Sequence, residues 1–188
     1  MAASSEGMKS MVDAEGRAVR VRLATPADDE AIARILVEGY VTAYAKKMPQ
    51  VVVSEERRKD LRSVAAKRAA ATVLVAEEAG EVRGTVAIWK PGAPGSEAWL
   101  RNAADLRHLA VDPARQGGGL SRPLLDEAER IARDDWKVSA VCLHVRRGNT
   151  GVARLYAARG YVRSPSGDII RPDIELEAYS LRFGDEVF

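Results

Sequence analysis

The sequence has a single cysteine, no long apolar run and almost no excess of charge, and each absence narrows what the chain can be. One cysteine, Cys142, excludes a disulfide within the chain, and its apolar surroundings predict a buried thiol in a reducing compartment. No segment approaches the roughly 20 consecutive apolar residues that a membrane-spanning helix requires. Lys and Arg total 29 against 27 for Asp and Glu, which argues against a nucleic-acid or membrane partner. These features predict a cytoplasmic protein.

The motifs of several other ligand-binding classes are also missing. No Gly-Lys-Ser/Thr is present to form the phosphate loop of a nucleoside triphosphatase, and the first β-α unit does not open on the Gly-x-Gly-x-x-Gly of a dinucleotide site. The two histidines, His108 and His144, stand in separate predicted strands without a cluster of metal ligands. We therefore predict no metal.

The size and composition favour one folded domain. With 188 residues, of which 46% are hydrophobic and 30% charged, the chain can enclose one substantial core. Residues 1–17 are polar and small and lack the apolar core of a signal peptide, so we expect a flexible leader. Residues 18–188 are expected to form a single domain.

Hydrophobic periodicity predicts a mixed α/β domain. Helical spacing predicts four helices, at about 25–40, 54–71, 118–136 and 149–159. Apolar runs bounded by turn residues predict seven strands, at 19–23, 72–76, 82–89, 106–111, 138–145, 161–163 and 174–183. Ala79-Gly80 predicts a hairpin between the second and third strands. The strand, helix and strand between Leu106 and Val145 predict a parallel pair joined by a right-handed crossover.

A glycine-rich turn separates the fourth predicted strand from the third predicted helix. The strand end Leu109-Ala-Val-Asp-Pro113 runs into Ala-Arg-Gln-Gly-Gly-Gly-Leu-Ser121. Glycines let the backbone approach a ligand closely, and a helix start presents N–H groups that have no partner within the helix. An anion such as pyrophosphate is the expected ligand, although a plain glycine-rich loop has the same composition.

This turn resembles the pyrophosphate loop of the GNAT superfamily of N-acetyltransferases. The family pattern is Gln/Arg-x-x-Gly-x-Gly/Ala, and this chain has Gln116-x-x-Gly119-x-Ser121, with serine as the last small residue. Pro123 is a second departure, because it removes one N–H near the start of the helix. A further family motif follows at the expected distance, with Asn149, Ala153, Leu155-Tyr156 and Gly160-Tyr161.

The resemblance implies both a fold and a co-substrate. The fold would be a mixed, mainly antiparallel sheet of about seven strands with about four helices, in which strands 4 and 5 form a parallel, splayed pair. Acetyl-CoA would bind with its pantetheine arm between those two strands. The cofactor-binding positions carried over from the family are Leu109, Ala110, Val111, Gln116, Gly117, Gly118, Gly119, Leu120, Ser121, Arg122, Asn149, Ala153 and Tyr156.

The resemblance also assigns catalytic roles. An amine attacks the thioester, Tyr156 protonates the departing CoA thiolate, and Asp105 is the candidate base, acting through water. Strand alternation places Asp105 and Arg107 on one face with Leu109 and places His108 on the other, so a core or interface role is preferred for His108. From the residues alone, Asn149 could be only a helix cap and Tyr156 only a core aromatic. The candidates for the acceptor pocket are Glu38, Tyr40 and Trp89.

The predicted function is acetyl-CoA-dependent transfer of an acetyl group to a primary amine of a small molecule or a protein. The alternative is a non-catalytic acyl-CoA-binding sensor or regulatory module. The presence of both Tyr156 and the glycine-rich turn favours the enzyme. The sequence does not identify the acceptor amine, and it leaves open whether the protein is a homodimer.

Overall fold

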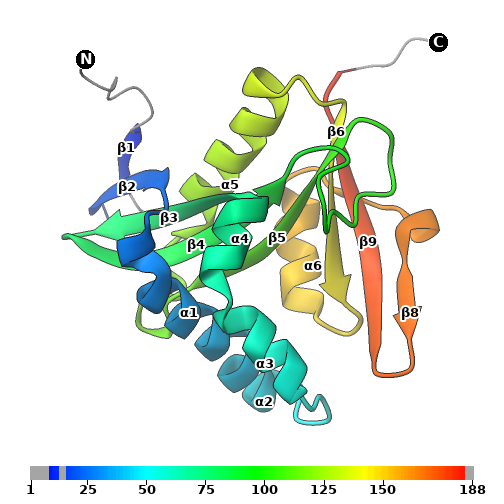
Figure 1. Cartoon of the computed structure of the whole chain (residues 1–188), viewed down its shortest axis with the longest axis horizontal. Helices are drawn as coiled ribbons and strands as arrows, with labels where there is room; N and C mark the ends of the chain where they lie inside the picture. The colour runs from blue at the N-terminus through cyan, green and yellow to red at the C-terminus, as the bar shows by residue number, and fades with distance from the viewer. Residues whose placement is uncertain (1–8, 13–15, 185–188) are drawn as a thin grey trace. The chain divides into compact units, whose positions relative to one another are not determined.

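A computed structural model describes residues 9–12 and 16–184 of the chain (Figure 1). The described strands form one sheet in the order β1-β2-β3-β4-β5-β6-β9-β7, and β8 pairs with β9. The chain divides into two compact units, Met1–Ala87 with His108–Ala128, and Ile88–Arg107 with Glu129–Phe188. Three elements contribute residues to both units: β4 (Glu81–Trp89), β5 (Ala103–Val111) and α5 (Ser121–Arg130).

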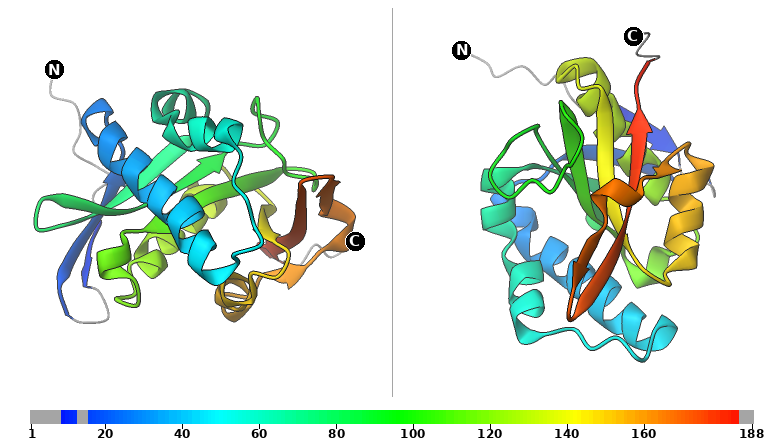
Figure 2. Two further views of the ribbon diagram at one scale, coloured as in Figure 1. Left: turned by 90° about the horizontal axis from the view of Figure 1, so that it is seen from below. Right: turned by 90° about the vertical axis from the view of Figure 1, so that its right-hand side faces the viewer.

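The first unit begins with antiparallel strands and continues with a group of helices. Strand β1 (Lys9–Val12) lies within the segment expected to be a flexible leader and pairs with β2, whereas residues 1–8 and 13–15 lie outside the described part. Helix α1 packs on α3 and on α4, and α4 contacts β3 (Figure 2). The further bounds are β2 (Ala18–Leu23), η1 (Pro26–Asp28), α1 (Asp29–Val37), η2 (Glu38–Thr42), α2 (Ala43–Lys47), α3 (Glu55–Arg62), α4 (Val64–Ala70) and β3 (Thr72–Glu78).

Helix α1 has the apolar face that the sequence predicts. Ile32, Ile35 and Leu36 recur at helical spacing and are all buried. The chain enters this helix through the short turn η1, whose last residue, Asp28, accepts hydrogen bonds from the backbone N–H and the hydroxyl of Thr25 at 2.7 and 3.0 Å. Thr25 therefore takes the predicted N-cap position, but the Asp28 carboxylate makes the capping hydrogen bonds.

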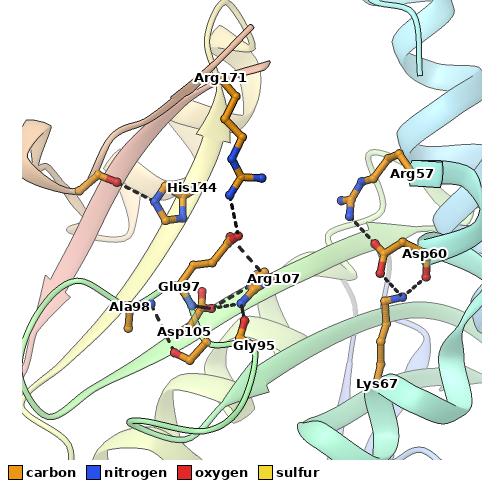
Figure 3. Close-up of polar contacts among 12 residues, drawn as sticks. Arg57, Asp60, Lys67, Gly95, Glu97, Ala98, Asp105, Arg107, His144 and Arg171 are labelled. Carbon is orange, nitrogen blue, oxygen red and sulfur yellow. Dashed lines mark hydrogen bonds and ion pairs between the residues drawn. The ribbon is translucent and has the colours of Figure 1, made fainter. Parts of the chain in front are cut away.

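The single helix predicted over residues 54–71 is wrong, because Ser63 divides it into α3 and α4. Ser63 leaves the helical conformation, with ψ at 58°, and its hydroxyl donates to the Lys59 carbonyl at 2.9 Å. The buried ammonium of Lys67 donates to the carbonyl of Asp60 (Figure 3). Side chains thus take the carbonyl groups that a continuous helix would use for its own N–H groups.

The second unit is built around the parallel pair and a C-terminal hairpin (Figure 2). Strands β5 and β6 are parallel, as the sequence predicts, and their register runs from Ala103 opposite Ala140 to Leu106 opposite Leu143. Strand β9 is antiparallel to β6 and also pairs with β7 and with β8. The bounds are β6 (Ala140–Arg146), α6 (Thr150–Ala158), β7 (Val162–Arg163), η5 (Pro165–Gly167), β8 (Ile169–Arg171) and β9 (Ile174–Arg182). The mixed, mainly antiparallel sheet confirms the predicted fold class.

The segment between β4 and β5 packs on the buried start of the parallel pair. Trp99 contacts a cluster that contains Ala103, Ala140 and Cys142, all almost fully buried. The approach is so close that a Cβ atom on Gly167 would lie 2.1 Å from the Trp99 ring. Cys142 is fully buried, which confirms the prediction of a buried cysteine, and this burial raises the pKa of its thiol. Among the helices of the described residues, none has the length and apolar character needed to span a membrane.

We expect Asp28→Asn to lower the free energy of unfolding by about 1–2 kcal/mol at neutral pH. The hydrogen bond from Arg22 lowers the pKa of Asp28 from 3.8 to about 2, although burial opposes the shift. A carboxyl group whose pKa is lowered by folding stabilises the protein above its unfolded pKa, and this contribution is lost as the pH falls through the folded pKa. The difference between wild type and variant should therefore shrink between about pH 4 and about pH 2. Urea unfolding across this range measures it, and a pH-independent difference would contradict the linkage.

Candidate active site

The glycine-rich turn lies in the first unit, between β5 and α5. Asp112 precedes the short turn η3 (Pro113–Arg115), and Gly117 and Gly119 then adopt left-handed backbone with φ of 84° and 79°. Glycine takes this conformation without the steric cost that a Cβ atom brings. The predicted bend before a helix is confirmed, and α5 begins at Ser121, three residues later than the sequence indicates.

A buried carboxylate, Asp112, holds the entrance of the turn. It accepts hydrogen bonds from the Ala114 N–H at 3.0 Å, from Arg83 at 3.1 Å and from Arg34 at 3.2 Å. Its own N–H donates to the Arg83 carbonyl at 2.7 Å. Burial alone would raise the pKa of Asp112, but the hydrogen bonds from Ala114, Arg83 and Arg34 outweigh burial and lower it. The sequence analysis did not identify Asp112, although an Asp before a Pro is a recognisable helical N-cap signal.

Arg115 fixes the middle of the turn. Its guanidinium binds both carboxylate oxygens of Glu78 on β3, at 2.7 and 2.9 Å. Gly118 packs against it so closely that an added Cβ atom would lie 3.2 Å from the Arg115 carbonyl oxygen and 3.4 Å from its guanidinium. Gly118 is therefore constrained by space, whereas Gly117 and Gly119 are constrained by backbone conformation.

The turn presents a row of backbone donors. No residue in the described part of the chain accepts a hydrogen bond from the N–H groups of Gly117, Gly119, Leu120 or Ser121. Pro123 is the third residue of α5, where a helix does not use the N–H that proline lacks. These N–H groups at a helix start form an environment that favours an anion.

His108 interrupts the regular backbone of β5. Its φ is 58°, a left-handed value that is uncommon for a residue with a Cβ atom and is typical of a bulge in a strand. Side chains do not keep alternating between the two faces of a strand across such a residue. Alternation therefore no longer supports the prediction that Leu109 shares a face with Asp105 and Arg107. The His108 side chain is buried, and its ring lies edge-on to Tyr40 at 6.3 Å between centroids, in agreement with the preferred core role.

Tyr40, a candidate acceptor residue, contacts β5, one of the two strands predicted to lie on either side of the pantetheine arm. Its hydroxyl donates to the carbonyl of Leu109 at 3.1 Å. Burial raises the pKa of the Tyr40 hydroxyl, which keeps it a donor at physiological pH. Glu38, in the same η2 turn, pairs with Arg34 at 3.1 Å. Trp89 belongs to the second unit, where the Arg107 guanidinium lies 4.5 Å from the centre of its ring.

Asp105, the candidate base, is fully buried in the second unit and is held through one oxygen (Figure 3). Its Oδ2 accepts hydrogen bonds from the Glu97 N–H at 2.7 Å and from Arg107 Nε at 2.8 Å. This confirms that Asp105 and Arg107 share a face of the strand. The other oxygen, Oδ1, is buried and has no hydrogen-bond partner among the described residues.

Asn149 stands at the start of α6, beside a cavity of about 260 Å³. It has the N-cap position, and its side chain makes no capping hydrogen bond to this helix. The cavity is also lined by Ala153, a second predicted cofactor-binding residue on this helix, and by Glu177 and Tyr179 of β9. Asn149 and Ala153 therefore line the same cavity of the second unit.

Tyr156 lies about one turn beyond Ala153 on α6 and is buried, with 5% of its surface exposed. Its ring is edge-on to that of Tyr161, at 5.3 Å between centroids.

His144 has a partner that the sequence did not reveal, because its Nε2 lies 2.8 Å from the Gly167 carbonyl oxygen. A group of three or more His, Cys, Asp or Glu side chains that could hold a metal does not occur in the described residues.

The comparison with known families accounts for the order of these elements. The sequence profile of the Acetyltransferase (GNAT) family matches residues 30–161, which include the turn, α6 and Tyr161. The chain belongs to the GNAT family of acetyltransferases.

Individual GNAT proteins are only distantly similar. The mycothiol acetyltransferase of Salinispora arenicola (strain CNS-205) is 32% identical over 98 residues, which are 50% of this chain and 30% of that protein. The matched segment therefore spans less than a third of that relative.

Solved GNAT structures share the fold over most of the chain. The GNAT domain of S. lividans PAT has a TM-score of 0.68 at 20% identity and covers 96% of this chain and 100% of its own. The yncA protein of Salmonella typhimurium, whose structure holds its cofactor acetyl-CoA, has a TM-score of 0.63 at 21% identity. The match covers 90% of this chain and 96% of the yncA chain. At these identities the likeness shows the fold alone.

In this GNAT chain, we expect Asp112→Asn to lower the free energy of unfolding by about 1–3 kcal/mol, because two guanidinium groups lose a buried anionic acceptor. The matched control is Glu81→Gln, which removes the exposed partner of the same Arg83 and should cost no more than about 1 kcal/mol. Denaturant unfolding measures both variants. Equal destabilisation would show that Asp112 does not anchor the turn.

Proposed function

We propose that this protein transfers the acetyl group of acetyl-CoA to a primary amine. The observation that carries the proposal is the row of four backbone N–H groups, Gly117, Gly119, Leu120 and Ser121, that have no acceptor in the described part of the chain. A pyrophosphate supplies oxygen acceptors and negative charge together, which suits a helix start. The hydrogen bonds of Asp112 and the contact of Arg115 with Glu78 support this role, because they fix the conformation of the turn without a ligand.

The proposed reaction is direct attack on the thioester. The neutral amine forms a bond to the thioester carbonyl carbon, and a backbone N–H of Leu109–Val111 stabilises the oxyanion that develops. The carbon–sulfur bond then breaks, the acetyl group stays on the amine nitrogen, and Tyr156 gives its proton to the CoA thiolate. The amine loses one proton in the process, and this proton requires a base.

Asp105 is the proposed base, acting through Oδ1. Two neighbours already donate to Oδ2, and complete burial of the side chain means that an amine proton would have to reach Oδ1 through an intervening water. The acceptor remains a primary amine of a small molecule or a protein. Glu38, Tyr40 and Trp89 stay the proposed acceptor residues, and the described contacts of Glu38 and Trp89 with arginines are ones that an acceptor would have to share or displace.

The first test is stabilisation by ligand. Saturating acetyl-CoA should raise the melting temperature by several degrees, whereas NAD and ATP should not, because a ligand that binds only the folded state stabilises it by mass action. Gly119→Val should abolish the shift, since valine is strained at a φ of 79° and adds a side chain to the turn.

The matched control for this test is Gly80→Val. Gly80 has nearly the same φ, 81°, with nothing within 4 Å of an added Cβ atom, and it lies in the turn between β3 and β4. This variant should lose stability but keep the acetyl-CoA shift. A wild-type protein that shows no shift at millimolar acetyl-CoA would refute the proposal.

The second test concerns Tyr156. Tyr156→Phe keeps the ring and removes the hydroxyl, so we expect kcat to fall by about 10²-fold while the KM for acetyl-CoA changes little. The loss is limited because a thiolate, with a thiol pKa of about 8.5, is already a tolerable leaving group. CoA release measured across a panel of amines identifies an acceptor and then gives both constants. A Tyr156→Phe variant with unchanged kcat would make Tyr156 a packing residue. If the wild-type protein binds acetyl-CoA but releases no CoA in the presence of any of the amines, the result would favour the sensor.

A further inference from the structure

The end of α6 folds the chain back over Tyr156. The N–H of Gly160 donates to the Ala157 carbonyl at 3.0 Å, and the N–H of Tyr161 donates to the Tyr156 carbonyl at 3.1 Å. With Gly160 at a φ of 94°, these two hydrogen bonds form a Schellman motif. This motif brings the residue after the glycine onto the last turn of the helix, and here it brings the Tyr161 ring against the Tyr156 ring.

The far end of Tyr161 is also fixed. Its hydroxyl donates to Oε1 of Glu129 at 3.1 Å. The same carboxylate receives two hydrogen bonds from Arg159, at 3.0 Å from Nε and 2.6 Å from Nη2. Glu129 is buried and Tyr161 is only 3% exposed, so these charge-assisted hydrogen bonds are shielded from water. Tyr161 is thus held by its backbone at one end and by its hydroxyl at the other.

This double attachment has a consequence for Tyr156. An aromatic ring held at both ends leaves its neighbour little room to rotate, because buried side chains pack without spare volume. Burial raises the pKa of Tyr161, with Glu129 adding to the effect, so its hydroxyl stays protonated and remains a donor to the carboxylate.

We propose that Glu129 and Arg159 are positioning residues, which set the orientation of the Tyr156 hydroxyl through the ring of Tyr161. The inference rests on the proposed role of Tyr156 as general acid and extends it to residues that do not touch the substrate. A general acid must lie within hydrogen-bond reach of the departing atom, and a displacement of about 1 Å in a catalytic group can cost up to 10²-fold in rate.

The test is a double-mutant cycle between Tyr161→Phe and Tyr156→Phe. Tyr161→Phe keeps both the Schellman motif and the ring contact and removes only the hydrogen bond to Glu129. We expect it to lower kcat by about 3- to 10-fold with an unchanged KM for acetyl-CoA. In the Tyr156→Phe background, the same change should alter kcat by less than about 2-fold, because no hydroxyl remains to be oriented.

A second variant and a control complete the experiment. Glu129→Gln removes the charge that holds Arg159 and should show the same dependence on the Tyr156 hydroxyl. The control is Arg130→Gln, at the position of α5 next to Glu129. It breaks the exposed ion pair of Arg130 with Asp135 and should leave kcat unchanged in both backgrounds. A merely structural cluster would lower the melting temperature without this non-additivity in kcat.

The outcomes separate the two proposals. If Tyr156→Phe lowers kcat but Tyr161→Phe and Glu129→Gln act equally in both backgrounds, or not at all, the positioning role is overturned and the general acid stands. If Tyr156→Phe itself retains full turnover, both are overturned. Loss confined to the background that keeps the Tyr156 hydroxyl supports the inference.

Discussion

The buried carboxylate of Asp112 joins the elements around the turn between β5 and α5. It receives one charged donor from α1, another from β4 and a backbone donor from its own turn. Without it, two guanidinium groups and one N–H would lose a shielded acceptor, which is more costly than the loss of an exposed ion pair. Together with the Arg115 contact to Glu78, Asp112 fixes the backbone in a conformation that a free glycine-rich segment would rarely adopt. If an anion binds there, a turn ordered in advance lowers the entropic cost of binding, because the backbone does not have to be ordered by the ligand.

The second unit meets a different requirement, the orientation of a side chain. Gly160 closes α6, and the two hydrogen bonds of the helix end place Tyr161 on Tyr156. Glu129 then holds the Tyr161 hydroxyl, with Arg159 balancing its charge. In both units, glycine in the left-handed region directs the chain and a buried carboxylate with an arginine partner fixes the result. The two sites thus use the same physical means to hold backbone donors in one case and a phenol in the other.

Local sequence signals predicted the features that depend on neighbouring residues. The seven predicted strands, the parallel pairing of β5 with β6 and the glycine-rich bend before α5 follow from periodicity and from backbone sterics. Local signals failed where distant residues decide. Arg115 and Glu78 are 37 positions apart, and Arg159 and Glu129 are 30 apart, so no spacing rule connects them. The short strands β1 and β8 owe their pairing to β2 and β9, respectively. The left-handed backbone of His108 had no signal, because its residue type does not demand it.

This division explains which departures from the family pattern the chain tolerates. Ser121 stands where the family pattern has Gly or Ala, and Pro123 lies in the first turn of α5, yet the donors that the turn presents are backbone N–H groups. A serine supplies the same N–H as an alanine, and the proline lacks one that a helix start leaves unused. The side chains at these positions therefore need only be small or point away. Tyr156 has no such freedom in the proposed mechanism, because the group that would act is its own hydroxyl. In the proposed function, recognition by backbone N–H groups would thus permit a loose motif at the turn, whereas proton donation by a side chain would require a fixed residue on α6 and fixed neighbours around it.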